Sequence, residues 1–312
     1  MQQKGDSMDK SIHSYMKPGT ILHVSYPETA SDSSLVLDRL DRIIDDCFFE
    51  AVEVTHIEDA EVRREAAARI HAAKLEAVFG GQGMTLGPHL SLCDESEDGR
   101  EKAVAALKRG IDDACEMGCS SMQFMSGSPS RTSEEGIAAA GRQLVRSTRE
   151  LCRYAEEQNL PLMCEVFDYD VDKKALIGPV KRAAAYAEEV CREFPAFGLL
   201  VDLSHIPLLH ESIEESLLPA QKFLRHVHIG NTVVTEGAVA YGDTHPRFGF
   251  PGSANDTREV AEFLKTLFRI GYLGEGKRPI VSFETKPWNG EPANAVLANA
   301  KRTLQQAWNL YI

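Results

Sequence analysis

The chain has 312 residues and a formal net charge of −13, with 43% hydrophobic and 26% charged residues. These values are typical of a globular protein, and a single α/β barrel commonly reaches this length. They disfavour a membrane protein, because no apolar run is long enough to span a bilayer, and a nucleic-acid partner, because an acidic chain is repelled by a phosphate backbone.

The amino-terminal 18 residues lack the apolar core and cleavage site of a secretory signal. We expect them to form a flexible arm ahead of one domain at residues 19–312. The seven cysteines are an odd number without CxxC spacing, which indicates reduced thiols. Both observations predict a cytoplasmic protein.

Short β-branched runs alternate with longer helix-period stretches along the rest of the chain. The predicted strands are residues 21–27, 51–57, 75–81, 121–127, 162–168, 197–205, 226–231 and 280–287. The clearest predicted helices are residues 99–118, 133–158, 180–194, 257–273 and 294–310. Eight strands with crossover helices predict an α/β fold of the (β/α)₈ barrel type, in a single domain.

Two long connections follow the third and seventh predicted strands, at residues 81–99 and 232–256. Barrel enzymes build their substrate pockets from loops at this end of the strands. The first strand-to-helix turn has no GxGxxG pattern, which disfavours a dinucleotide-binding sheet.

Ionisable residues end the last four predicted strands, within otherwise apolar sequence: Glu165, Asp202, His228 and Glu284. A buried carboxylate needs a compensating partner, and several that converge on one barrel mouth indicate a cation. One such residue alone is more often a helix cap or an ion-pair partner, whereas four in order are hard to explain that way. The mixed oxygen and nitrogen set suits one divalent ion, Mn²⁺ first, with Mg²⁺ or Co²⁺ as alternatives. His226 is an alternative ligand.

At these positions the sequence resembles the xylose-isomerase-like TIM-barrel superfamily, and within it the tagatose/psicose 3-epimerase-like sugar isomerases and epimerases. The resemblance rests on the glutamates of the fifth and eighth strands, on a DxxH element at Asp202 and His205, and on the HxHxG element HVHIG. It implies that Glu165, Asp202, His228 and Glu284 bind the metal. It also implies that His205 contacts a substrate hydroxyl.

Two departures separate this chain from the ketohexose epimerases. Asn231 replaces the Glu of an HxHxGE element, with no Arg soon after it, and Val171 replaces a second acidic residue that follows Glu165. These altered loops also resemble the catalytic subunit of bacterial C-glycoside deglycosidases, which work beside a small β-rich partner. We therefore expect a homo-oligomer or a complex with such a subunit.

The predicted function is a metal-dependent sugar isomerase or epimerase that abstracts a proton next to a carbonyl and passes through a metal-stabilised enediolate. By resemblance, Glu165 and Glu284 are base and acid. The alternatives are cleavage of 3-oxo-C-glycosides by the same enolisation followed by elimination, and a non-catalytic sugar-binding barrel. An abasic-site endonuclease is disfavoured, because the chain lacks extra strand-end histidines and a basic surface.

Further residues on or beyond the strand ends are candidate substrate contacts, although loop aromatics more often pack against their own loop. They are His56, Lys286, Trp288 and Phe248, and for an aglycone slot also Met84, His89 and Phe250. Lys286 has the alternative of a solvated loop residue.

Overall fold

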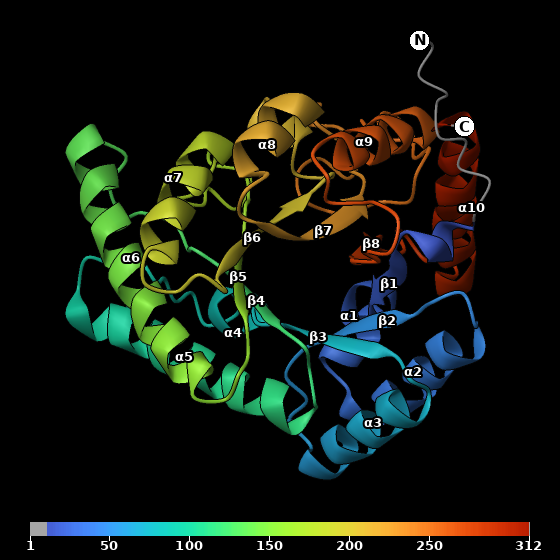
Figure 1. Ribbon diagram of the computed structural model, residues 1–312, viewed down its shortest axis with the longest axis horizontal. Coiled ribbons are helices and arrows are strands. Elements are labelled where there is room, and N and C mark those ends of the chain that lie inside the picture. Colours follow the sequence, from blue (N-terminus) through green and yellow to red (C-terminus); the bar gives the residue numbers. More distant parts are fainter. Residues whose placement is uncertain (1–10, 312) are drawn as a thin grey trace.

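A computed structural model describes residues 11–311 as a closed barrel of eight parallel strands, which pair in chain order from β1 to β8 and back to β1 (Figure 1). The strands are β1 Lys17–Ile21, β2 Ala51–Val54, β3 Glu76–Gly80, β4 Met122–Met125, β5 Leu162–Glu165, β6 Gly198–Asp202, β7 Leu224–Gly230 and β8 Ile280–Glu284. The predicted (β/α)₈ TIM barrel in a single domain is therefore confirmed.

Helices form a ring outside the strands (Figure 1). The α-helices are α1 Leu22–Ser25, α2 Val36–Asp45, α3 Ala60–Ala72, α4 Gly83–Leu86, α5 Glu97–Glu116, α6 Glu134–Glu156, α7 Val180–Cys191, α8 Ile213–Ala220, α9 Thr257–Arg269 and α10 Ala293–Tyr311. The 3₁₀ turns are η1 Ile12–Ser14, η2 Pro27–Ala30, η3 Ser33–Leu35 and η4 Pro207–Leu209. Among the described residues no helix is long and apolar enough to cross a membrane.

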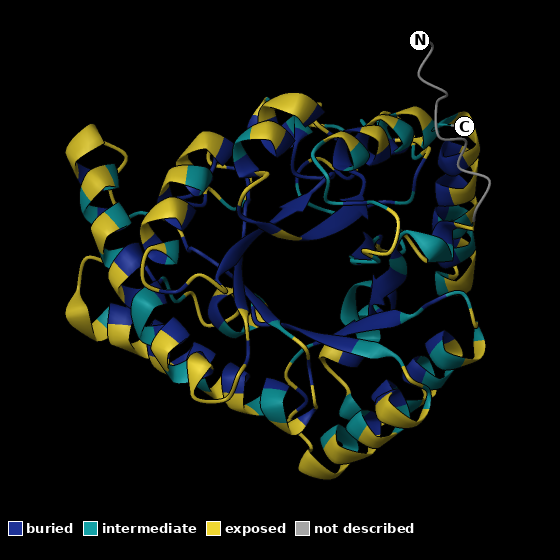
Figure 2. Cartoon of the chain, in the orientation of Figure 1, coloured by how far each residue is buried: buried dark blue, intermediate teal, exposed yellow. Residues whose placement is uncertain are grey.

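Local sequence sets where several helices begin. The Ser96 hydroxyl accepts the Gly99 amide at the start of α5, and Asp256 and Glu259 form a reciprocal capping box on α9. Such caps satisfy backbone N–H groups that the helix itself leaves unpaired. The helices turn exposed residues outward, whereas the strands are almost wholly buried (Figure 2).

The barrel interior has an apolar floor and a polar upper part. Ala51, Val78, Met163 and Ile280 form a separate buried cluster at its floor. Side chains alternate along a strand, so the residues two positions further on share the inner face. On β2 and β5 these are Glu53 and Glu165. The interior therefore becomes polar towards the carboxyl ends of the strands.

The first predicted strand is displaced. We expected residues 21–27, but β1 is Lys17–Ile21 and the next four residues form α1. Pro18 and Gly19 normally disfavour a strand interior, so the sequence did not predict a strand at residues 17–20. A small residue suits position 19, because a Cβ there would lie 2.5 Å from Ser282 Oγ on the neighbouring β8 and 3.2 Å from Ala51 Cβ on β2. Close approach of two strands, rather than local propensity, sets this element.

The expected arm at residues 1–18 falls partly outside the described residues, which begin at residue 11. Its described part is ordered into η1 and the start of β1, and Ile12 and Met16 are buried in the main hydrophobic core. The structure thus begins the barrel at Lys17, ahead of the predicted boundary. All seven cysteines are free thiols, as their spacing predicted.

Candidate metal and substrate site

The four ionisable residues predicted at the strand ends lie together at the mouth of the barrel. Glu165, Asp202, His228 and Glu284 each offer a ligand atom, and these atoms lie within 4.8 Å of one another. The first three are at most 2% exposed. This cluster could hold a metal ion.

Glu165 is held at one oxygen and free at the other. Gln82 Nε2 donates to its Oε2 at 2.6 Å, while Oε1 is buried without a hydrogen-bond partner among the described residues. Imidazole nitrogens of His205 and His228 lie 3.7 and 3.6 Å from Oε1. A buried oxygen without a partner is costly unless a ligand or an ion completes its environment.

The DxxH element forms a compact turn after β6. The Asp202 carboxylate accepts the Ser204 amide at 2.8 Å and the Ser204 hydroxyl at 2.6 Å. His205 Nδ1 lies 2.9 Å from the Val166 carbonyl and Nε2 lies 3.1 Å from Asp243 Oδ1. Both ring nitrogens of His205 are thus engaged, which fixes its orientation, and this buried residue is not among those that line the adjoining cavity.

His228 connects the cluster to the barrel interior. Its Nδ1 lies 2.7 Å from Glu284 Oε2, and its Nε2 lies 3.2 Å from both oxygens of Glu53. His226, the alternative ligand, instead has its Nε2 2.8 Å from Glu53 Oε1, and Gln123 Nε2 donates to Glu53 Oε2 at 2.6 Å. His226 belongs to this inner layer, one step below the four-residue cluster.

A steric constraint explains the glycine of the HVHIG element. A Cβ on Gly230 would lie 2.6 Å from the Glu284 carbonyl oxygen, 3.2 Å from Ser204 Cβ and 3.4 Å from Asp202 Oδ1. Real Cβ atoms essentially never lie within 3.0 Å of another heavy atom, so a side chain at position 230 would displace the backbone of Glu284. The absence of a side chain therefore lets β7 and β8 bring His228 and Glu284 together.

Several residues that complete the site were missed by sequence reasoning. Glu53 reads as one polar residue in a short alternating strand, while Asp243 and His245 lie in the long loop at residues 232–256. His245 Nε2 lies 2.7 Å from Asp243 Oδ1 and 3.3 Å from Glu284 Oε1, and Lys173 Nζ lies 2.8 Å from Asp243 Oδ2. The DTH sequence in a loop after a strand was the available signal for Asp243 and His245.

Carboxylates outweigh imidazoles in this cluster. Burial disfavours the charged imidazolium, yet Glu284 and Asp243 overcome it and raise the pKa of His245 to about 9. The pKa of His228 is likewise raised despite burial, mainly by Glu53 and Glu284. The site attracts positive charge, and a divalent cation would supply it; oxygen and imidazole donors are also the ligands that such ions prefer.

The cluster opens into a cavity of about 400 Å³. Of the predicted substrate contacts, Lys286 and Trp288 line this cavity, whereas Phe248 is 1% exposed and packs in the hydrophobic core. His56 lines an adjoining groove. The other wall is largely apolar, with Phe167 and Leu86 among its residues.

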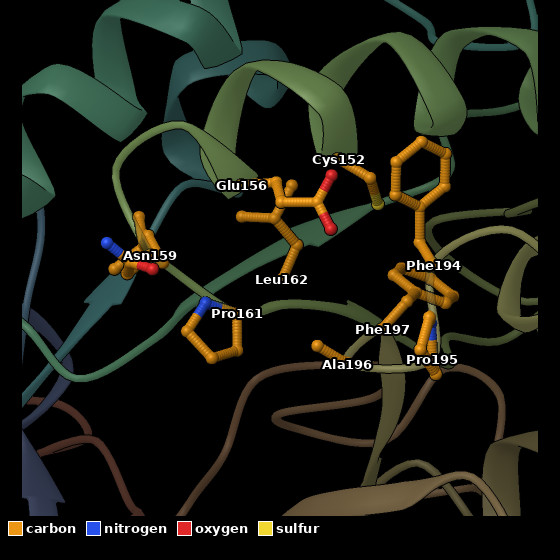
Figure 3. Close-up of a pocket in the computed structure, with 10 residues that line it drawn as sticks. Cys152, Glu156, Asn159, Pro161, Leu162, Phe194, Pro195, Ala196 and Phe197 are labelled. Carbon is orange, nitrogen blue, oxygen red and sulfur yellow. The ribbon is translucent and has the colours of Figure 1, made fainter.

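Another cavity, of about 290 Å³, lies at the opposite end of the barrel (Figure 3). It is lined by Pro161 and Leu162 at the start of β5 and by Phe197 just before β6. Cys152 also lines it, and burial raises the pKa of this thiol to about 12. It contains no group of metal-ligating residues among those described.

Comparison with known proteins assigns the family. A model of the xylose isomerase-like TIM barrel matches residues 44–305. The chain belongs to this family. The resemblance inferred from the strand-end motifs is thereby confirmed, and the family match spans most of the barrel.

Several solved structures are similar in fold to this chain at low sequence identity. One is a D-tagatose 3-epimerase-like protein (TM-score 0.70, 16% identity, 95% of this chain and 100% of that chain). Another is the 3-keto-D-glucoside 4-epimerase of E. coli (TM-score 0.68, 18% identity, 93% and 99%). A third is the IOLI protein with a bound zinc atom (TM-score 0.72, 16% identity, 95% and 99%). No curated protein sequence matches the chain.

Proposed function

We propose that this member of the family is a metal-dependent sugar isomerase or epimerase that moves a proton on a carbon next to a carbonyl group. The observation that carries the proposal is the four-residue cluster, in which two glutamates that can exchange protons share one small cavity with a potential metal site. The activities of the structurally similar epimerases point the same way.

Glu165, Asp202, His228 and Glu284 would hold the ion, with Mn²⁺ as our first choice and Mg²⁺ or Co²⁺ as alternatives. A bound divalent cation would supply Lewis-acid stabilisation of negative charge that develops on the substrate carbonyl oxygen. These residues suit a divalent cation for two reasons. Ligand atoms of three carboxylates and one imidazole lie within 4.8 Å of one another. The raised pKa of His228 indicates that negative charge predominates around the cluster.

Glu165 would remove the proton, and Glu284 would return one. Glu165 Oε1 has no hydrogen-bond partner among the described residues, so this carboxylate has an acceptor position to spare. Burial raises the pKa of Glu284 above its ordinary value although His245 and His228 oppose the shift, so this group takes up a proton more readily than an exposed glutamate. The two glutamates end strands that are separated by two others, so they can approach a substrate from different sides.

Other residues of the cavity would orient the sugar. His205 Nε2 would contact a sugar hydroxyl in exchange for its 3.1 Å contact with Asp243, a residue that lines the cavity. The Phe167 ring packs on His205 with ring centroids 4.5 Å apart, which limits access of water to this side. Lys286 and Trp288 would complete the binding surface from beyond β8.

The test is exchange of substrate hydrogen for deuterium in D₂O, measured by NMR on Mn²⁺-loaded protein with ketoses and 3-oxo-glucosides. Glu165→Gln and Glu284→Gln should each lower the exchange rate by about 10²–10⁴-fold with the fold retained. Glu156→Gln, a charge loss at the opposite end of the barrel, is the control. Exchange at the wild-type rate in both active-site variants would refute the proposal and favour a non-catalytic sugar-binding barrel.

Cleavage of 3-oxo-C-glycosides is the second candidate, because it starts from the same proton removal and needs an apolar slot for the leaving group. Leu86, Phe167 and Trp288 provide an apolar wall in the cavity. Release of an aromatic aglycone from a 3-oxo-C-glucoside, followed by chromatography with and without a small β-rich subunit, tests it. Ketose epimerisation at ordinary rates by the chain alone would exclude this alternative.

A further inference from the structure

A polar groove adjoins the metal-facing cavity. It has a volume of about 680 Å³ and shares His23 and Gly83 with that cavity. His23 follows β1 and Gly83 starts α4, so the two residues form the boundary between the spaces. The cavity and the groove are therefore neighbours that meet at His23 and Gly83.

The groove is built from side chains that exchange hydrogen bonds with hydroxyl groups. Its lining includes Thr55, His56, Arg109, Asp112 and Asp113. Donors and acceptors of both charges lie in this one groove, which suits a neutral polyhydroxylated ligand. A phosphate would face two carboxylates, and an aromatic ring would remove these polar groups from water without replacing their hydrogen bonds.

Packing holds this lining in place. His56 Nδ1 lies 2.5 Å from Asp113 Oδ2, and the Thr55 hydroxyl donates to the Gly80 carbonyl at 2.8 Å. A Cβ on Gly110 of α5 would lie 2.6 Å from Met84 Sδ, so α4 and α5 approach closely beside the groove. A preformed site of this kind loses little entropy when it binds a ligand.

His23 has an unused hydrogen-bonding atom at the boundary. Its Nδ1 is buried and has no partner among the described residues. Burial lowers the pKa of His23 to about 4, with a smaller opposing effect of Glu53, so the imidazole is neutral at pH 7. A neutral imidazole can accept a hydrogen bond from a hydroxyl group or donate one to it. A hydroxylated ligand at the boundary would give this imidazole a hydrogen-bond partner.

We infer that the substrate has two rings: a reacting sugar in the metal-facing cavity and a second, hydroxylated sugar unit in the groove of Thr55, His56, Arg109, Asp112 and Asp113. The inference rests on the proposed function for the reacting ring. It adds the substrate class, a disaccharide or sugar glycoside rather than a free monosaccharide, a sugar phosphate or an aryl glycoside.

Gly83 allows a selective obstruction at this boundary. A Cβ on Gly83 meets no heavy atom within 4 Å, so a larger side chain fits there without a clash and would narrow the space beside this boundary residue. Gly83→Leu also replaces a poor helix former in α4, so the fold should be retained. Gly141→Leu is the matched control, because a Cβ on this α6 residue is equally unobstructed and Gly141 lines neither space.

The experiment compares one-ring and two-ring substrates that share the reacting sugar: D-fructose with lactulose, and 3-oxo-glucose with 3-oxo-cellobiose. Deuterium exchange on Mn²⁺-loaded protein gives kcat/KM for each. The wild type and Gly141→Leu should prefer a two-ring substrate by about tenfold or more, and Gly83→Leu and Arg109→Ala should lose that preference. One-ring substrates should react within about twofold of wild type in Gly141→Leu and Arg109→Ala. Gly83 also lines the metal-facing cavity, so Gly83→Leu is judged by its ratio of two-ring to one-ring kcat/KM.

Two results would overturn the inference. One is an equal kcat/KM for one-ring and two-ring substrates in the wild type. The other is an equal fall in kcat/KM for both kinds of substrate in Gly83→Leu. If no pair reacts, the proposed function fails, and calorimetric binding of cellobiose against D-glucose decides the groove separately. Tighter binding of cellobiose that Gly83→Leu abolishes would support the groove as a sugar site, whereas indistinguishable binding of the two sugars would reject it.

Discussion

Replacement of Glu53 by Gln should weaken metal binding although this residue is not one of the four proposed ligands. Glu53 is fully buried and contacts His228 Nε2 at 3.2 Å, His226 Nε2 at 2.8 Å and Gln123 Nε2 at 2.6 Å. Burial alone would raise its pKa, but His228 and His226 outweigh burial and hold the pKa of Glu53 well below its ordinary value. An ionised Glu53 fixes the orientation of the His228 ring and directs Nδ1 to the metal cluster.

The amide of Gln keeps the shape and removes the charge. Loss of such an outer partner of a ligating histidine typically lowers metal affinity by about 10–100-fold. This range corresponds to about 1.4–2.7 kcal/mol. Isothermal titration calorimetry with Mn²⁺ measures it directly, without any need for turnover.

Two controls separate this effect from a general loss of stability. Glu156→Gln makes the same chemical change at the opposite end of the barrel and should leave the Mn²⁺ affinity unchanged. Thermal unfolding of the metal-free variants measures the change in stability separately, and Glu53→Gln should have a lower midpoint because His226 and His228 lose their buried carboxylate partner. An Mn²⁺ affinity within twofold of wild type in Glu53→Gln would refute the role assigned to this carboxylate.

Three further changes test other parts of the structure. Gly230→Ala should lower the free energy of unfolding by about 1–3 kcal/mol and weaken Mn²⁺ binding, because its Cβ would lie 2.6 Å from the Glu284 carbonyl oxygen; denaturant titration and calorimetry measure the two effects. Arg100→Ala should cost about 2–3 kcal/mol in the same titration, because Arg100 is 2% exposed and joins α5 to α6 through Ser147 and Glu150. Burial raises the pKa of Cys93 to about 11, so this thiol is neutral at pH 8 and should react with a thiol reagent far more slowly than the exposed Cys47; comparable modification rates by mass spectrometry would contradict this.

Strand periodicity and strand-end polarity carried most of the prediction. Seven of the eight strands overlap their predicted ranges closely, because apolar runs between long amphipathic helices leave few other interpretations. The first strand was displaced, because Pro18 and Gly19 disfavour a strand by local rules while the close approach of β8 favours a small residue there. Local propensity cannot detect a constraint that comes from a strand more than 250 residues away.

The remaining site residues were hidden for different reasons. Glu53 lies inside a four-residue strand, and only closure of the barrel brings it to His226 and His228. The positions of Asp243 and His245 depend on the path of a long loop, and hydrophobic periodicity does not predict the path of a loop. Sequence order identifies residues at the ends of strands far better than residues whose role depends on contacts across the barrel.

The register of the sheet explains why four ligands in chain order were nevertheless accessible to sequence reasoning. Glu165 pairs with Leu200, Asp202 with His228, and Gly230 with Glu284. Side chains alternate with a period of two, so residues two positions apart on one strand face the same side. Leu200 and Asp202 therefore both face the barrel interior on β6, as do His228 and Gly230 on β7. A one-residue slip in any of these strands would turn a ligand towards the helices and place an apolar residue in the cavity. The hydrophobic residues between the ligands, which pack outward in the core, therefore specify the position of the site as firmly as the ligands do.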